Sequence, residues 1–231
     1  TFDEIGDFKS KSRMKHFYAH GGIPCARWQM ADTLDSALAF AAQYGYPLIC
    51  KPDVGVGASN PHKLNNEEEL HALFEHGFSE PMILEEYVPG DCFTFDGITN
   101  SRKEVQFATS HHYVGSIMDS VNDSDSIGCY SLIDIPEDIM DVGTRCVAAF
   151  DTRSRFFHFE FFRLREDREG LGKQGDILGL EVNMRPPGGF LPDMINYAND
   201  FDIYDIWARV MIDDGVLIEP HQRHSCAFAG R

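Results

Sequence analysis

Residues 178–185 read Leu-Gly-Leu-Glu-Val-Asn-Met-Arg, a stretch with the alternation of a β-strand. Alternate side chains of a strand share a face, so Glu181, Asn183 and Arg185 are predicted to point the same way. The other face carries the apolar set Leu180, Val182 and Met184. Carboxylate and amide oxygens suit Mg²⁺, and an arginine two residues further suits a phosphate or a developing oxyanion. Taken alone, the pattern also fits an edge strand with a solvated polar face.

A second strand is predicted at residues 155–164, within which residues 156–162 read Phe-Phe-His-Phe-Glu-Phe-Phe. The phenylalanines predict burial on both faces, and His158 and Glu160 fall on the same one. A carboxylate in such an aromatic run needs a cation or a hydrogen-bonded partner. This requirement favours a functional site over a solvated edge.

The segment between the two strands, residues 165–176, is charged and glycine-rich, which predicts a long hairpin loop. If the strands pair antiparallel, parity places Glu160 opposite Glu181 or Asn183, because only then do these side chains share a face. Two carboxylates and an amide would converge there. The sequence therefore predicts a magnesium site formed by Glu160, Glu181 and Asn183.

A phosphate-binding segment is predicted earlier in the chain. Lys51 ends a predicted strand and is followed by the glycine-rich stretch 52–60. Glycines let backbone amides approach phosphate oxygens, and the lysine supplies a point charge. The candidate loop residues are Gly55, Gly57, Ala58 and Ser59. Lys11, near the start of the first predicted helix, is a second and weaker candidate, because surface lysines are common and a solvated charge also fits it.

The 231-residue chain has a formal net charge of −17, six cysteines and 43% hydrophobic residues. An acidic chain with no basic stripe argues against nucleic acid as a partner. The cysteines form no Cys-x-x-Cys pair and are expected to be reduced, structural thiols in a cytoplasmic protein. No apolar run is long enough to span a membrane, and no signal peptide opens the chain. Because it starts with Thr1 and ends at Arg231, both ends are expected to be cut from a longer chain.

The order of predicted elements indicates an α+β protein with two lobes. The first part alternates helices and strands, namely helices 9–20, 34–44 and 67–77 with strands 46–51 and 82–87. The second part is rich in strands, namely 92–98, 105–112, 155–164 and 178–185, and ends with a helix at 203–212. The predicted boundaries are residues 1–88 for the first lobe, 89–218 for the second and 219–231 for a tail or further segment.

One further segment, residues 84–90, reads Leu-Glu-Glu-Tyr-Val-Pro-Gly. Two acidic residues followed by an aromatic–aliphatic pair and Pro-Gly join the two predicted lobes. Taken with the first lysine helix ending at Gly22-Ile23-Pro24, the lysine–glycine loop and the Glu-x-Asn-x-Arg strand, the order of motifs resembles the ATP-grasp superfamily. That superfamily includes biotin carboxylase, the carbamoyl-phosphate synthetase large subunit and bacterial amino-acid ligases.

The resemblance implies two lobes with antiparallel sheets enclosing a nucleotide cleft, and it covers about residues 11–216. It implies that the segment 84–90 binds adenine through Glu86 C=O and Val88 N–H, with Glu85 and Tyr87 beside them. It places Lys11 and Lys51 on the phosphates of ATP, with Lys51 and Arg185 as catalytic groups. It implies one or two Mg²⁺ ions, or Mn²⁺ in their place, on the predicted metal ligands.

Two departures from the family pattern concern the nucleotide and the substrate. The position two residues after the hinge glycine is Cys92 rather than a glutamate, which leaves Asp91 as the neighbouring candidate for the ribose. The resemblance implies an N-terminal lobe before this core, which residues 1–231 do not include, so a separate N-terminal lobe or a homodimer is the expected partner. The turn 186–189, Pro-Pro-Gly-Gly, fits either a substrate-carboxylate site or a plain turn.

The resemblance implies an ATP- and Mg²⁺-dependent ligase that activates a small-molecule carboxylate as an acyl phosphate for attack by an amine or ammonia. Two alternatives remain open from the sequence. One is activation of bicarbonate or carbamate, as in carboxylases and carbamoyl-phosphate synthesis. The other is a nucleotide-binding module without turnover.

Overall fold

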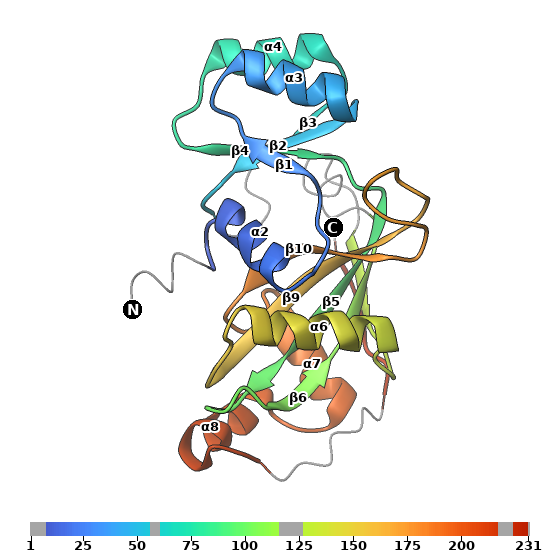
Figure 1. Cartoon of the computed structure of the whole chain (residues 1–231). Helices are drawn as coiled ribbons and strands as arrows, with labels where there is room; N and C mark the ends of the chain where they lie inside the picture. The colour runs from blue at the N-terminus through green and yellow to red at the C-terminus, as the bar shows by residue number, and fades with distance from the viewer. Residues whose placement is uncertain (1–7, 56–60, 116–126, 217–223, 231) are drawn as a thin grey trace.

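Two antiparallel sheets, one above the other in Figure 1, organise the chain. The computed structural model describes residues 8–55, 61–115, 127–216 and 224–230. The sheets mix with helices, so the predicted α+β class is confirmed. Within the described residues no helix is both long and apolar enough to cross a membrane.

The upper sheet has four strands in the order β1-β4-β2-β3. Their bounds are Trp28–Met30 for β1, Leu48–Pro52 for β2, His62–Leu64 for β3 and Met82–Glu86 for β4. Helices α3 (Leu34–Tyr44) and α4 (Glu67–His76) cover its upper face (Figure 1). The Thr33 and Asn66 side chains cap these helices by accepting the N–H groups of Ser36 and Glu69.

The lower sheet has seven strands, six of them in the order β10-β9-β5-β7-β8-β11, with β6 also paired to β5. The bounds are Gly90–Thr99 for β5, Val105–Thr109 for β6, His111–Val114 for β7, Ile127–Ser131 for β8, Arg155–Leu164 for β9, Ile177–Asn183 for β10 and Ala227–Gly230 for β11. The change from the upper to the lower sheet falls between residues 86 and 90, next to the boundary predicted at 88.

The alternation of β9 divides its side chains between two environments. Phe157, Phe159 and Phe161 join a core formed with α2 (Lys11–His20) and α6 (Glu137–Ala149). The even-numbered residues face the opposite side, where Phe156 packs under α7 (Leu191–Asn199) and α8 (Ile203–Asp213). His158 and Glu160 therefore share one face, as the sequence predicts.

Three of the predicted parts are arranged differently in the structure. The predicted strand 105–112 is two strands, β6 and β7, interrupted at Ser110, whose hydroxyl donates to Thr94 O. Helix α2 packs through Met14 and Tyr18 against the core of the lower sheet, although it was predicted as part of the first lobe. Residues 227–230 form β11 at the edge of the lower sheet, where a tail or further segment was predicted.

Candidate functional site

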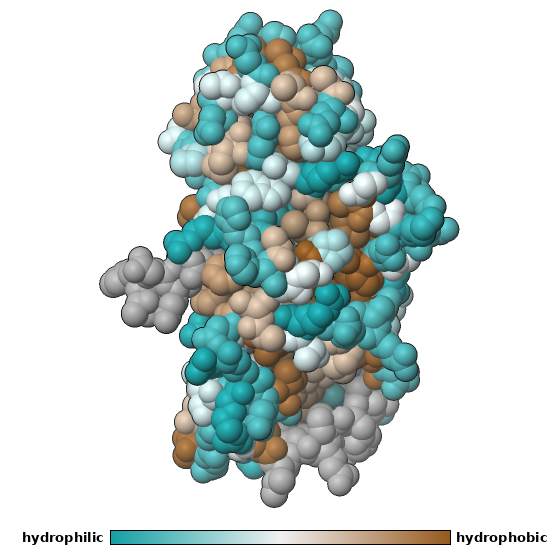
Figure 2. All heavy atoms as spheres, in the orientation of Figure 1, coloured by the Kyte–Doolittle hydropathy of each residue, from teal (hydrophilic) through white to brown (hydrophobic). Residues whose placement is uncertain are grey.

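A cavity of about 730 Å³ opens between the two lobes. Its walls are the hinge 85–88, the end of β2, helix α2 and the face of the lower sheet that carries His158 and Glu160. Figure 2 shows apolar surface, in brown, where the upper lobe meets the lower one. Ligand sites are usually concave and mostly apolar with a few converging polar groups, and this cavity has both features.

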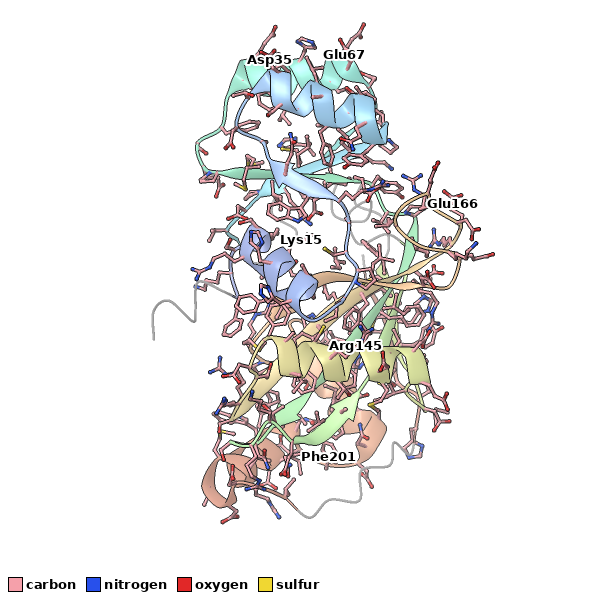
Figure 3. The ribbon with its side chains drawn as sticks, viewed as in Figure 1. Lys15, Asp35, Glu67, Arg145, Glu166 and Phe201 are labelled. Atoms are coloured by element: carbon pink, nitrogen blue, oxygen red, sulfur yellow. The ribbon has the colours of Figure 1, made fainter. Side chains whose placement is uncertain are left out.

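Glu85 links two lysines at the roof of the cavity. Its carboxylate lies 2.7 Å from Lys51 Nζ and 2.9 Å from Lys15 Nζ. Burial alone would raise the pKa of Glu85, but the two ammonium groups lower it to about 2. Glu85 thereby holds both lysines beside the cavity through ion pairs, and Figure 3 shows Lys15 on α2 below the upper sheet.

Lys11 lines the same wall of the cavity, one helical turn before Lys15. Burial, only partly offset by Glu181, lowers its pKa. The start of its helix is tied to the end of β2 by Asp53, whose carboxylate accepts from Ser10 Oγ at 2.8 Å and from Ser12 N at 2.7 Å. This capping arrangement brings the predicted phosphate lysines of two separate elements to one wall.

The side chains of the hinge residues are held by contacts with residues outside the hinge. The Glu86 side chain accepts a bidentate pair of hydrogen bonds from Arg27, at 2.6 and 2.8 Å. Tyr87 lies under Lys63, whose Nζ is 4.7 Å from the ring centroid. Val88 is buried in a small apolar cluster with Leu178. Backbone groups of the hinge, rather than the Glu86 carboxylate, are thus the parts of this segment suited to read a base edge.

The predicted metal ligands converge on the floor of the cavity. Glu181 pairs directly with Glu160 across β10 and β9, which confirms the predicted register. Asn183 Nδ2 donates to Glu181 Oε1 at 3.3 Å. Burial, together with the Glu160 carboxylate, raises the pKa of Glu181. A pair of crowded, partly buried carboxylates with an amide beside them fits a hard divalent cation.

An irregularity in β10 shapes this floor. The register shifts between Gly179 and Glu181, so that Leu180 lines the cavity instead of pointing into the core with Val182. The predicted alternation is wrong at this one residue, because a β-bulge adds a residue to one strand. Within the described chain, no group of three or more His, Cys, Asp and Glu residues is arranged to hold a metal, so the candidate site depends on the amide as well as the two carboxylates.

Glu160 is the first member of a series of buried polar side chains joined by hydrogen bonds. His158 donates through Nε2 to Glu160 Oε1 at 3.2 Å and through Nδ1 to Asp96. Asp96 also accepts from Thr94 Oγ1 and, at 2.9 Å, from His111 Nδ1. Burial alone would lower the pKa of His158, but the Asp96 and Glu160 carboxylates raise it to about 10. The imidazolium therefore orients Glu160 from the rear.

Replacing Asp96 by asparagine is expected to lower the free energy of unfolding by about 3 kcal/mol, because a buried imidazolium would lose its charged partner. Urea denaturation at pH 7 measures the change. Asp35→Asn, an exposed change on α3 (Figure 3), serves as the control and should alter stability by less than about 0.5 kcal/mol. Equal stability of the Asp96→Asn and Asp35→Asn proteins would show that the hydrogen bonds of Asp96 with His158 and His111 do not stabilise the fold.

Arg185 follows β10, the strand that carries Glu181 and Asn183, and its side chain is exposed where it lines the cavity. Its Nη1 donates to Pro186 O at 2.9 Å, which leaves most of the guanidinium donors available. Gly188 and Gly189 continue the same wall. The arginine and the turn 186–189 therefore lie together at the cavity, as a substrate-side group would.

Other predicted residues are distributed differently. The Asp91 carboxylate accepts from Arg165 at 2.7 Å and does not line the cavity, because in β5 it is Cys92 that faces this side. Ribose binding by Asp91 stays a prediction, and it would require this carboxylate to leave Arg165. Gly55 does not line the cavity either. Gly57, Ala58 and Ser59 lie outside the described residues.

Sequence reasoning missed Lys15 and the role of His158. Lys15 had a usable signal, since it lies four residues after Lys11 and hence on the same helical face. His158 was placed on the correct face but had no predicted partner. Asp96, its partner, lies 62 residues away along the chain, and no local pattern joins them.

The chain has the ATP-grasp fold. Residues 10–89 match the family described as "Carbamoyl-phosphate synthase L chain, ATP binding domain". A relative, the carbamoyl phosphate synthase arginine-specific large chain of Halalkalibacterium halodurans, is 28% identical over 103 residues, which are 43% of this chain and 10% of that protein. The resemblance drawn from the sequence motifs is thus confirmed.

Two solved structures show the likeness over nearly the whole chain. N5-carboxyaminoimidazole synthase from Aspergillus clavatus, in complex with ADP and an aminoimidazole ribonucleotide, superposes with a TM-score of 0.77 at 17% identity, covering 98% of this chain and 57% of the other. The L-amino acid ligase from Bacillus licheniformis gives a TM-score of 0.74 at 14% identity, covering 97% and 53%. The chain therefore spans a little over half of these structures and about a tenth of its curated relative.

Proposed function

We propose that this chain carries the nucleotide-binding and catalytic core of an ATP- and Mg²⁺-dependent ligase that joins a carboxylate to an amine. The observation that carries the proposal is the Glu160–Glu181 carboxylate pair facing Lys11 and Lys51 across one cavity. Cations on one wall and paired carboxylates on the other suit a nucleotide triphosphate whose charge is shared with Mg²⁺.

The base of ATP is proposed to lie at the hinge end, against apolar side chains of both lobes. Ile49 comes from the upper sheet, while Phe162 and Leu180 come from the lower one. The hinge backbone at residues 86–88 would bond the base edge. Lys11 and Lys51 line the same cavity and would neutralise phosphate oxygens, and Glu85 would orient Lys51 through their 2.7 Å ion pair.

Glu160, Glu181 and Asn183 would hold Mg²⁺ or Mn²⁺, which supplies charge neutralisation for the β- and γ-phosphates. The substrate carboxylate oxygen attacks the γ-phosphorus, and the bond to the β–γ bridging oxygen breaks, leaving ADP. The amine then attacks the acyl carbon and inorganic phosphate departs, with the amine proton lost to solvent. Arg185 stabilises the negative charge that develops on the transferred group and on the tetrahedral oxygen.

An acyl phosphate can be trapped with hydroxylamine, which gives a hydroxamate and phosphate. The proposal expects MgATP-dependent hydroxamate formation with at least one carboxylate in a panel of amino acids and simple acids. Calorimetric binding of MgATP without ADP or hydroxamate release under any acid would favour a nucleotide-binding module instead.

Activation of bicarbonate is the second candidate, favoured by the match of residues 10–89 to a carbamoyl-phosphate synthase domain. The same assay separates the two candidates. ADP release that requires bicarbonate, and that no organic carboxylate supports, would select this second reaction.

Arg185→Ala is expected to lower the rate of hydroxamate formation by roughly 10²–10³-fold, because one preorganised oxyanion donor is lost. Its thermal unfolding midpoint should not change, since Arg185 is exposed. Arg145→Ala, on the outer face of α6 (Figure 3), is the control and should retain the wild-type rate. If Arg185→Ala formed hydroxamate at the wild-type rate, Arg185 would have no part in the proposed mechanism.

A further inference from the structure

A row of uncharged side chains crosses the whole lower sheet on the cavity side. Leu178 pairs with Phe162, and Phe162 pairs with Cys92. Tyr113 pairs with Cys129, and Cys129 pairs with Phe228. Cross-strand partners lie on the same face of a sheet, and all six residues line the cavity.

The two ends of this row have different neighbours. Leu178 and Phe162 belong to the cluster that includes the hinge residue Val88, so their end is the proposed nucleotide end. Tyr113, Cys129 and Phe228 lie at the other end, beyond β5, and a nucleotide base at the hinge does not reach across the sheet to them. Under the proposed function, this distal end is therefore left free for the second substrate.

Helix α7 supplies the second wall of the distal end. Leu191 and Met194 are buried against Cys129. Phe190, just before the helix, stacks on Phe228 with ring centroids 5.0 Å apart and planes 29° apart. Even so, 60% of Phe190 is exposed, and it lines the cavity. Tyr113, Cys129, Phe190, Leu191, Met194 and Phe228, which line this end, are all uncharged residues.

The distal end is continuous with the proposed reaction centre. Phe190 lies five residues after Arg185, on the far side of the turn 186–189. A carboxylate held at Arg185 would direct its substituent past Gly188 and Gly189 toward Phe190 and Phe228. Bicarbonate has no substituent to place there, and an acidic or basic side chain would lose its hydration without a partner.

We propose that Tyr113, Cys129, Phe190, Met194 and Phe228 form the subsite for the side chain of the carboxylate substrate, and that this side chain is apolar and aromatic. The inference rests on the proposed ligase function and names its substrate class. An aromatic ring can extend the Phe190–Phe228 stack and bury its faces against Met194 and Cys129.

The test compares 3-phenylpropionate with acetate, which share the carboxylate and differ in the ring. In the hydroxamate assay, kcat/KM for 3-phenylpropionate should exceed that for acetate by about a hundredfold. Phe190→Ala should lower this ratio about tenfold, because the stacking surface is removed, and Phe190→Leu should recover part of it. Tyr197→Ala removes an exposed aromatic ring from the same helix outside the cavity and should leave the ratio unchanged.

Calorimetric titration of the protein with each acid, without nucleotide, distinguishes failure of the subsite from failure of the ligase. Turnover with equal kcat/KM for the two acids, or an unchanged ratio in Phe190→Ala, overturns the subsite and leaves the ligase function standing. Tighter binding of 3-phenylpropionate that Phe190→Ala weakens, with no ATP turnover, supports the subsite and overturns the ligase. Equal binding of both acids without turnover overturns the two together.

Discussion

Glu181→Gln is expected to lower Mg²⁺-dependent ATP turnover by roughly 10³-fold while the fold is retained. The side chain keeps its size but loses the charge that, with Glu160, suits a divalent cation. Stability should stay the same or rise, because burial and the Glu160 carboxylate already raise the pKa of Glu181 and disfavour its charged form. ADP release at saturating MgATP and the thermal midpoint measure the two effects.

Glu166→Gln is the matched control, since Glu166 is an exposed glutamate on the loop between β9 and β10 (Figure 3). Its turnover should equal that of the unchanged protein. Unaltered ADP release in Glu181→Gln would remove the carboxylate pair from the proposed site. A large loss of stability in that variant would instead show that Glu181 has a structural role.

Glu85→Gln is expected to lower the free energy of unfolding by about 3 kcal/mol at pH 7. The change removes the shared negative charge between Lys15 and Lys51, and Lys15 is fully enclosed. Adding Lys15→Met to Glu85→Gln should recover part of the loss, because no enclosed ammonium then lacks a carboxylate. Urea denaturation of the two single variants, the double variant and the unchanged protein measures the coupling free energy between Glu85 and Lys15.

The contribution of Glu85 should also depend on pH in a defined direction. Its pKa is about 2 in the folded protein and near 4.5 when the group is free. A carboxyl group whose pKa is lower in the folded protein stabilises the fold fully at any pH above its pKa in the unfolded chain. This stabilisation is lost as the pH falls from about 4.5 toward 2. The stability difference between the unchanged protein and Glu85→Gln should therefore shrink over that window.

The control for Glu85 is Glu75→Gln, an exposed change on α4, for which the difference should stay below about 0.5 kcal/mol at every pH. A Glu85→Gln protein as stable as the Glu75→Gln protein at pH 7 would contradict the proposed network. So would a difference that grew as the pH fell.

Much of the lower sheet was accessible from local patterns. The run 155–164 was predicted with its observed bounds, because alternating aromatic residues leave few other ways to bury both faces. The second helix, its Thr33 cap and its end at Gly45 also follow from local signals that act within one turn. Helix α6 was missed, although Pro136, two acidic residues in its first turn and apolar residues such as Ile139 and Val142 were present.

The site was predictable to the extent that its members share an element or a strand pair. Parity placed Glu160 opposite either Glu181 or Asn183, and the structure shows Glu181 as its partner. The bulge at Leu180 was not predictable, since a register shift depends on how two strands twist against each other. The Asp96–His158 contact was not either, because Asp96 reaches it from another strand of the sheet.

By itself, the sequence determined the chemical character of this protein: lysines at a helix start and a strand end, a hinge of two glutamates, and Glu-x-Asn-x-Arg after an aromatic strand. These follow from residue type and spacing, which act locally. Only the tertiary structure decided that Lys15 and Lys51 share Glu85, that Asp91 faces away from the cavity, and that Tyr113, Cys129 and Phe228 form one apolar row. Pairing across strands and the burial that shifts a pKa depend on which distant segments meet, and a linear pattern carries little of that information.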